Sequence, residues 1–257
     1  MIQSVRRAGS ILRELGSGPR PLGVTELAER LGLAKATVYG LLRSLEVEEL
    51  VERDVETGRY RLGPTLLQLG NAYLDSHELR ARSLLWADAL ATRTSEAVRV
   101  GVPNGPNVLI VHHVFRPDDS VQILEVGASI PWHVSALGKA IAAHDFEEVR
   151  DRLLEGPLPR LTGRTITDPE ELRRALEEVH RAGVAVEDQE AVIGEAEVAA
   201  AILDHDGVPR GAIGVAGPVE RLLPDGVARG DLVAAVKESA RGLTRDLGGG
   251  RRYARIR

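Results

Sequence analysis

The stretch ELAERLGLAKATVYGLLRSLE, residues 26–46, decides the fold of the N-terminal part of the chain. Its apolar residues recur at helical spacing in two runs, which predict helices over 26–31 and 35–46. Gly32 supplies the tight turn between them, and Thr25 is placed to cap the first helix. Two short helices joined by a glycine turn predict a helix-turn-helix unit.

The residues on either side of this unit extend it to a winged helix-turn-helix. An amphipathic pattern predicts a further helix over 4–15. Strands are expected at 50–53 and 60–62, around a turn in which Gly58 supplies a positive φ. Three helices followed by a hairpin indicate that residues 1–63 form a winged helix-turn-helix domain, a class that binds double-stranded DNA.

The rest of the chain predicts a linker and a second domain. Residues 64–77 form the linker, with a helix that begins at Pro64 and ends near Tyr73. In the second domain, residues 78–248, six expected strands alternate irregularly with helices, which indicates an α+β fold. The strands are expected at 97–102, 108–114, 121–126, 184–186, 198–203 and 212–216, and the helices at 78–93, 135–143, 146–154, 169–182 and 230–247.

Composition excludes several classes of protein. Of the 257 residues, 43% are apolar and 28% charged, which is typical of globular chains. The absence of cysteine excludes disulfides, thiolate zinc sites and cysteine nucleophiles. No uncharged apolar run reaches the ~18 residues of a membrane helix, and the N-terminus has no signal-peptide pattern. We therefore expect a soluble cytoplasmic protein without a membrane partner.

Charge is distributed unevenly along the chain. Residues 1–63 contain 10 basic and 9 acidic side chains, whereas the remainder contains 23 basic and 29 acidic ones. A nearly neutral first domain binds DNA only if its basic groups lie on one face. The acidic second domain is not expected to lie on DNA. The basic tail, 249–257, is expected to be mobile and solvated, although its arginines are an alternative DNA contact.

Catalytic motifs are missing from the sequence. There is no P-loop, dinucleotide fingerprint, GxSxG or HExxH pattern, so we expect no catalytic residues and no cofactor. His112 and His113 are neighbours in an expected strand and point to opposite sides, so we also expect no metal site. Asp204-His205-Asp206-Gly207 is typical of a hairpin turn. A ligand-responsive DNA-binding protein fits best; a structural DNA-binding protein and an enzyme remain alternatives.

The order of motifs resembles the IclR family of bacterial transcriptional regulators over nearly the whole chain. The strings that carry the resemblance are SVRRAGSILREL, ELAERLGLAKATVYGLLRSLE, GRYRLGPTLLQLG, IPWHVSALGKAIAA, TGRTITD, VEDQE and GAIGVAGPVER. The family implies a GAF-like C-terminal domain that binds a small metabolite and forms a homodimer or a dimer of dimers. Longer strings, among them NAYLDSHELRARSLLWADALA, are similar to members that repress glycerol catabolism and respond to glycerol or glycerol 3-phosphate. The alternative is control of another catabolic pathway by a different polar or carboxylate effector.

The exposed face of the 35–46 helix is the expected reader of operator DNA. The candidate DNA-binding residues of this helix and of the wing are Lys35, Thr37, Tyr39, Arg43, Arg59 and Arg61. The alternative is that these residues are merely solvated, or that Tyr39 packs on the wing. Gly40 departs from the large polar residue common in the family. Either the backbone approaches DNA closely there, or neighbouring residues read the bases.

The resemblance also implies an effector pocket in the second domain. Its candidate residues are His133, Ser135, Ala136, Glu187, Glu197, Gly214 and Ala216. The family often has cysteine in place of Glu197 and serines in place of Gly214 and Ala216. Smaller residues at the last two positions are expected to widen the cavity and to disfavour a short carboxylic acid.

Glu197 is the least expected residue of this set, because it opens the apolar run 198–203. If its side chain points inward, the carboxylate needs a partner or a raised pKa. It would accept hydrogen bonds from a polyol and repel a phosphate. The alternative, that Glu197 faces solvent at the edge of a strand, is equally compatible with the sequence. Arg164, His133 and Lys139 are candidate sources of positive charge.

Overall fold

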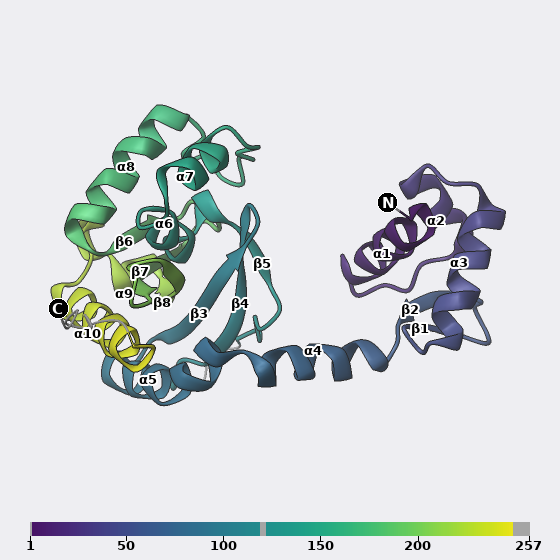
Figure 1. The fold of residues 1–257 in the computed structure, drawn as a ribbon, viewed down its shortest axis with the longest axis horizontal. Helices are drawn as coiled ribbons and strands as arrows, with labels where there is room; N and C mark the ends of the chain where they lie inside the picture. Colours follow the sequence, from purple (N-terminus) through teal and green to yellow (C-terminus); the bar gives the residue numbers. More distant parts are fainter. Residues whose placement is uncertain (1, 119–121, 249–257) are drawn as a thin grey trace, which may run out of the picture. The chain divides into compact units, whose positions relative to one another are not determined.

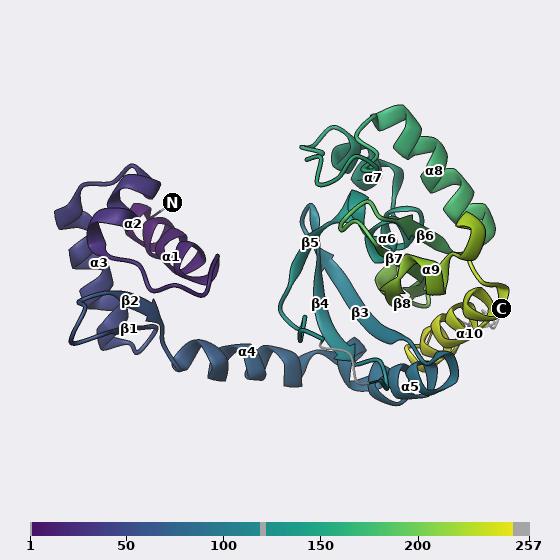
Figure 2. The same ribbon diagram turned by 180° about the vertical axis from the view of Figure 1, so that it is seen from behind.

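The computed structural model describes residues 2–118 and 122–248. They form two compact units, the first ending at Ser76 and the second beginning at His77 (Figures 1 and 2). Neither described range contains a helix whose length and low charge would let it cross a bilayer.

The N-terminal unit is the expected winged helix-turn-helix, followed by the linker helix. Its elements are α1 (Gln3–Gly16), α2 (Val24–Leu31), α3 (Lys35–Val47), β1 (Val51–Arg53), β2 (Tyr60–Leu62) and α4 (Thr65–Ser76). Ile11, Leu27 and Leu42, one from each of the first three helices, are fully buried in its core, and Tyr60 of the wing packs with them. The hairpin turn contains Gly58 at a φ of +67°, as predicted.

The second helix begins earlier than predicted. Gly23 is its N-cap, and Thr25 lies inside the first turn rather than capping it. The reason is Glu26, whose Oε2 accepts a hydrogen bond from the backbone N–H of Gly23 at 3.1 Å. A glutamate at the third helical position thus holds the entry to the helix.

The C-terminal unit is an α+β domain built on a curled antiparallel sheet in the order β5-β4-β3-β8-β7-β6 (Figure 1). Its strands are β3 (Ala97–Asn104), β4 (Asn107–Val114), β5 (Ser129–Pro131), β6 (Ala185–Asp188), β7 (Glu195–Leu203) and β8 (Pro209–Pro218). Its helices are α5 (Glu78–Thr94), α6 (Ala136–Ala142), α7 (Glu147–Leu154), α8 (Pro169–Ala182), α9 (Val219–Leu222) and α10 (Gly230–Asp246). Helices α5 and α10 cover one face of the sheet, and α6, backed by α8, covers the other (Figure 2). This is the GAF-like architecture that was expected.

One expected strand is wrong. Residues 122–126 form no strand, and Val121 lies outside the described residues. The side chains of Ile123 and Leu124 are 79% and 60% exposed, so the apolar pattern there has no core to cover. Strand β5 takes the place beside β4 after a turn in which Gly127 has a φ of +90°. The predicted mobile tail, 249–257, is also outside the described residues.

Candidate functional site

The third helix of the N-terminal unit presents a basic face. Val38 and Leu42 are fully buried on its inner side, whereas Lys35, Tyr39 and Arg43 are exposed. Thr37 is half-buried. Within the described chain, Lys35 and Arg43 form no hydrogen bond or ion pair, so both charges are free to meet a phosphate or a base edge.

The two arginines of the wing form hydrogen bonds and ion pairs within the N-terminal unit. Arg59 donates from Nη1 to the carbonyl oxygen of Pro21 at 2.7 Å and lies 3.0 Å from a carboxylate oxygen of Glu26. Arg61 contacts Glu52 on the neighbouring strand at 2.8 Å. These exposed ion pairs are weak, on the order of 0–1 kcal/mol, so a phosphate can compete for either guanidinium.

Gly40 lies on the exposed face of α3 between Tyr39 and Arg43. A Cβ atom added there meets no atom within 4 Å. Packing inside the unit therefore does not require glycine at this position. The open space leaves room for a partner surface to approach the backbone of the helix.

A cavity of about 300 Å³ opens beside the sheet of the C-terminal unit. Its polar lining comes from β3, β5, β6, β7, the segment before β5 and the segment that leads into α6. The residues that line it are Arg99, Glu125, Ser129, Ile130, Pro131, Val134, Ser135, Leu161, Glu187, Ala191, Val192, Glu195, Ala196 and Glu197.

Glu197 points into this cavity and is 3% exposed, which decides between the two orientations left open by the sequence. Its Oε2 accepts hydrogen bonds from Ser135 Oγ at 2.9 Å and from the backbone N–H of Leu137 at 3.3 Å. The carboxylate thus occupies the start of α6, where Ser135 is the N-cap.

The start of α6 is fixed by close packing against the turn at Trp132. A Cβ atom at Gly138 would lie 2.2 Å from the carbonyl oxygen of Trp132, so no other residue fits there. Ser135 Oγ also accepts a hydrogen bond from the backbone N–H of Gly138 at 3.4 Å. This packing holds the donors that bind Glu197 in place.

Arg99 of β3 supplies the cation of the cavity, with a side chain that is 15% exposed. Its Nη2 donates to Glu125 Oε1 at 2.7 Å, and its Nε contacts the other oxygen of the same carboxylate. Nη1 lies 3.6 Å from Glu197 and Nη2 lies 3.9 Å from Glu195. Burial opposes the charge on Arg99, but Glu197 and Glu125 overcome this and raise the pKa of the guanidinium.

Three residues of the lining were not predicted from the sequence: Arg99, Glu125 and Glu195. A signal for Arg99 was present, because it is the one charge inside the apolar strand AVRVGV, residues 97–102. A charge in such a strand is buried and needs a partner. The partner Glu125 lies in the segment that was expected to be a strand.

Glu187 of β6 lies opposite Glu197 in the sheet register and is 4% exposed. Burial, together with the negative charge of Glu197, raises the pKa of its carboxyl group to about 8. Its Oε1 accepts hydrogen bonds from the backbone N–H groups of Glu190 and Ala191. The group therefore holds a proton at neutral pH.

The other candidate residues lie outside the lining. Ala136 is fully buried in the core, and His133 places Nε2 3.0 Å from the carbonyl oxygen of Pro159. Ala216 borders a neighbouring cavity of about 250 Å³. A Cβ atom at Gly214 would lie 2.8 Å from that of Ala199, so this glycine serves the packing of two strands and does not widen the cavity.

Two other expected sources of positive charge form ion pairs outside the cavity. Lys139 is buried and pairs with Glu190, and Arg164 pairs with Asp188. Neither residue lines the cavity, and its positive charge comes from Arg99 instead.

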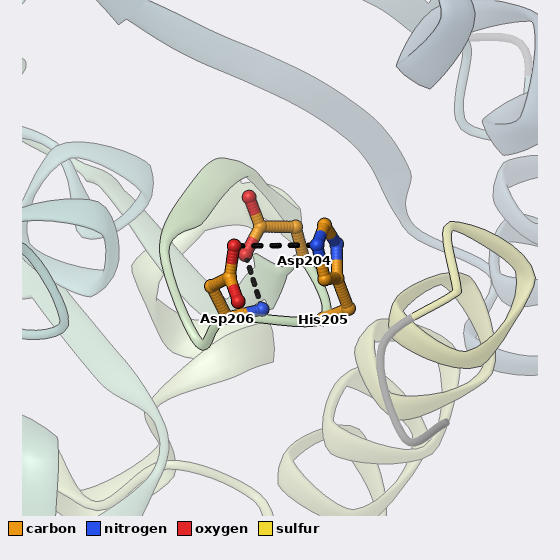
Figure 3. A group of neighbouring side chains, drawn as sticks. All are labelled: Asp204, His205 and Asp206. Carbon is orange, nitrogen blue, oxygen red and sulfur yellow. Dashed lines mark hydrogen bonds and ion pairs between the residues drawn. The ribbon is translucent and has the colours of Figure 1, made fainter. Parts of the chain in front are cut away.

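An exposed acidic turn joins β7 to β8 (Figure 3). Asp204 Oδ1 accepts hydrogen bonds from the backbone N–H groups of Asp206 and Val208 at 2.9 and 3.0 Å. His205 Nε2 lies 3.2 Å from Asp206 Oδ2. Gly207 has a φ of +82°, so the segment is the hairpin turn that its sequence predicts.

Comparison with known proteins covers both units. Residues 4–55 match the IclR helix-turn-helix domain, and residues 71–245 match the bacterial transcriptional regulator IclR C-terminal domain. The chain is 50% identical to the glycerol operon regulatory protein of Streptomyces griseus and 48% identical to that of Streptomyces coelicolor. Each alignment covers 97% of this chain and 98% of the relative.

The fold agrees with a solved structure of the same kind. The crystal structure of an IclR transcriptional regulator from Alicyclobacillus acidocaldarius matches with a TM-score of 0.82 and 30% identity. The match covers 96% of this chain and all of the other. Matches to the family's helix-turn-helix domain and to its C-terminal domain, together with relatives about 50% identical over 97% of the chain, show that the chain belongs to the IclR family of bacterial transcriptional regulators.

Proposed function

We propose that this regulator represses an operon for glycerol catabolism and that a small metabolite bound in the C-terminal cavity modulates its affinity for DNA. The observation that carries the proposal is the 50% identity to a glycerol operon regulatory protein over 97% of the chain. The protein acts in the cytoplasm, where the operator is.

In this proposal α3 enters the major groove of the operator. Lys35 and Arg43, both exposed and free of partners in the described chain, contact phosphates or guanine edges, and Thr37 and Tyr39 lie beside them. Arg59 and Arg61 reach the backbone or the minor groove from the wing. A homodimer, or a dimer of dimers, reads a nearly palindromic operator with half-sites about one helical turn, or a multiple of it, apart.

The effector half of the proposal rests on the buried polar groups of the cavity. Ser135, Glu187 and Glu197 converge there with Arg99. A ligand that binds one state of the protein better shifts its affinity for DNA, with a coupling of about 1–3 kcal/mol.

A footprint on the promoter of a glycerol catabolic operon tests the proposal. Full-length protein is expected to protect a nearly palindromic site at moderate salt and to bind random DNA far more weakly. Adding glycerol or glycerol 3-phosphate is expected to change the affinity by about 5- to 150-fold. Equal affinity for the promoter and for random DNA would exclude specific repression.

A further inference from the structure

The lining of the cavity is rich in hydrogen-bond acceptors. Its four carboxyl groups belong to Glu125, Glu187, Glu195 and Glu197, and among the described lining residues Arg99 is the basic one. With all of them ionised the lining has a net formal charge of −3, and with Glu187 protonated it has −2. An incoming anion therefore meets repulsion.

Several hydrogen-bond donors of the cavity are already engaged by the protein. Arg99 is bound to Glu125 and lies beside Glu197. Ser135 Oγ and the N–H of Leu137 both donate to Glu197. To reach the donors at the start of α6, a ligand carboxylate or phosphate would have to displace the side chain of Glu197 from a site where it is 3% exposed.

Two acceptor side chains, in contrast, are not saturated by donors of the described chain, and Glu197 Oε1 is buried without one. Glu197 Oε1 accepts no hydrogen bond from the described residues and has the guanidinium of Arg99 at 3.6 Å, and Glu195 is 53% exposed at the rim. Hydroxyl groups donate to such oxygens without bringing a charge. Ile130, Val134 and Leu161 supply apolar walls for carbon-bound hydrogens.

We propose that this cavity selects a small uncharged polyol and rejects the phosphorylated or carboxylated form of the same carbon skeleton. The polyol donates its hydroxyls to Glu197 and Glu195, while Arg99 stays paired with Glu125. The inference rests on the proposed function, of which it specifies the effector.

Ligand-observed saturation-transfer NMR on the full chain at pH 7 tests this selection. The probes are glycerol, glycerol 3-phosphate and glycerate, which share one three-carbon skeleton. Glycerol is expected to bind with an affinity on the order of 1 mM, as suits a ligand of few atoms. Glycerol 3-phosphate and glycerate are expected to bind at least about tenfold more weakly.

Charge-neutralising variants distinguish selection of the ligand by charge from selection by the shape of the cavity. Glu195→Gln removes a rim charge at an exposed position, so its folding is not at risk. It is expected to raise the affinity for glycerol 3-phosphate relative to that for glycerol about fivefold. The matched control, Glu238→Gln on α10, neutralises a 65% exposed carboxylate outside the cavity and is expected to leave that ratio unchanged.

Each result either supports or overturns the inference. Tighter binding of glycerol 3-phosphate or glycerate than of glycerol overturns it, as does the absence of glycerol binding or an unchanged ratio in Glu195→Gln. The promoter footprint distinguishes these failures. If glycerol 3-phosphate releases the operator, the proposed function stands and the selection of an uncharged polyol falls. If the protein shows no operator preference without ligand, the proposed function itself falls.

Discussion

Two regions of this regulator differ in the exposure and pairing of their basic side chains. On α3, Lys35 and Arg43 are exposed and, among the described residues, have no partner, whereas Arg99 in the cavity is 15% exposed and is surrounded by three glutamates. An exposed free cation contributes little to folding and is available to a polyanion. A buried, paired cation holds its neighbours in place and is costly to remove.

The comparison shows that net charge alone is a poor guide to function in this chain. Residues 1–63 have nearly equal numbers of acidic and basic groups, but several of the acids pair with arginines away from α3, as Glu26 and Glu52 do. Burial and pairing therefore decide which charges are open to a ligand. The following predictions test this contrast.

The largest effect is expected from Arg99→Ala. Removing the guanidinium leaves Glu125 and Glu197 without their cation, which should lower the free energy of unfolding of the C-terminal unit by about 3–5 kcal/mol. Urea unfolding followed by tryptophan fluorescence measures it, because Trp86 and Trp132, the two tryptophans of the chain, both lie in this unit. Arg93→Ala removes an exposed ion pair with Glu238 as the control and should cost less than about 1 kcal/mol. Similar losses for both variants would contradict the contrast.

The next effect concerns the pH dependence of stability. Glu187 has a pKa of about 8 in the folded chain, against the ordinary glutamate value of 4.5. Between these values the folded state holds a proton that the unfolded state has lost, so this contribution to stability is complete below pH 4.5 and is lost as the pH rises to about 8. Glu187→Gln carries no titrating proton. The free energy of unfolding of the variant minus that of wild type should therefore be about 2–4 kcal/mol larger at pH 8.5 than at pH 5.

The same urea unfolding at the two pH values measures this difference. Glu238→Gln is again the control, since its exposed carboxylate has a pKa that is lowered by Arg93. A difference between Glu187→Gln and wild type that does not vary with pH would show that Glu187 is ionised in the folded chain.

Arg43→Ala is expected to weaken operator binding by about 10- to 100-fold, since a base or phosphate contact of this kind is worth about 1–3 kcal/mol. Glycerol binding should not change. A gel shift at fixed salt measures the loss, and Arg181→Ala, which removes an exposed arginine of the C-terminal unit, is the control. An equal loss in both variants would mean that overall charge, and not α3, governs the affinity.

The smallest effect is expected from Gly40→Ala. Because a Cβ atom at this position meets nothing within 4 Å, alanine should stabilise α3 by about 1 kcal/mol through its higher helix propensity. Hydrogen exchange of the α3 amides measures this gain. If the backbone must approach DNA at Gly40, the same variant binds the operator more weakly although it is more stable. Unchanged DNA binding would instead assign base reading to the neighbours of Gly40.

Much of the fold was predictable, because local periodicity and turn chemistry agree with the final structure. The apolar stripe of α3, Gly32 in the turn and Gly58 in the wing each predict local geometry that the structure confirms. The predicted strand at 121–126 failed for a physical reason. Alternating apolar residues indicate a strand only when a core covers them, and Ile123 and Leu124 are exposed.

The candidate cavity was harder to predict than the fold. Ser135, Glu187 and Glu197 are placed together by the structure, but Arg99 and Glu125, which pair with each other and line the same cavity, were not anticipated. They lie 26 residues apart in the sequence, on segments with different patterns. No local spacing predicts such a pair.

The sequence by itself determined the two units, the winged helix-turn-helix and the family, since these follow from periodicity, turn residues and the order of motifs. Only the tertiary structure decided that Glu197 turns inward, that Glu187 holds a proton, and that the cation of the cavity is Arg99 rather than Lys139 or Arg164. The reason is that burial and ion pairing depend on which distant strands become neighbours. A carboxyl group in water has an ordinary pKa, whereas burial and a neighbouring guanidinium each shift that pKa.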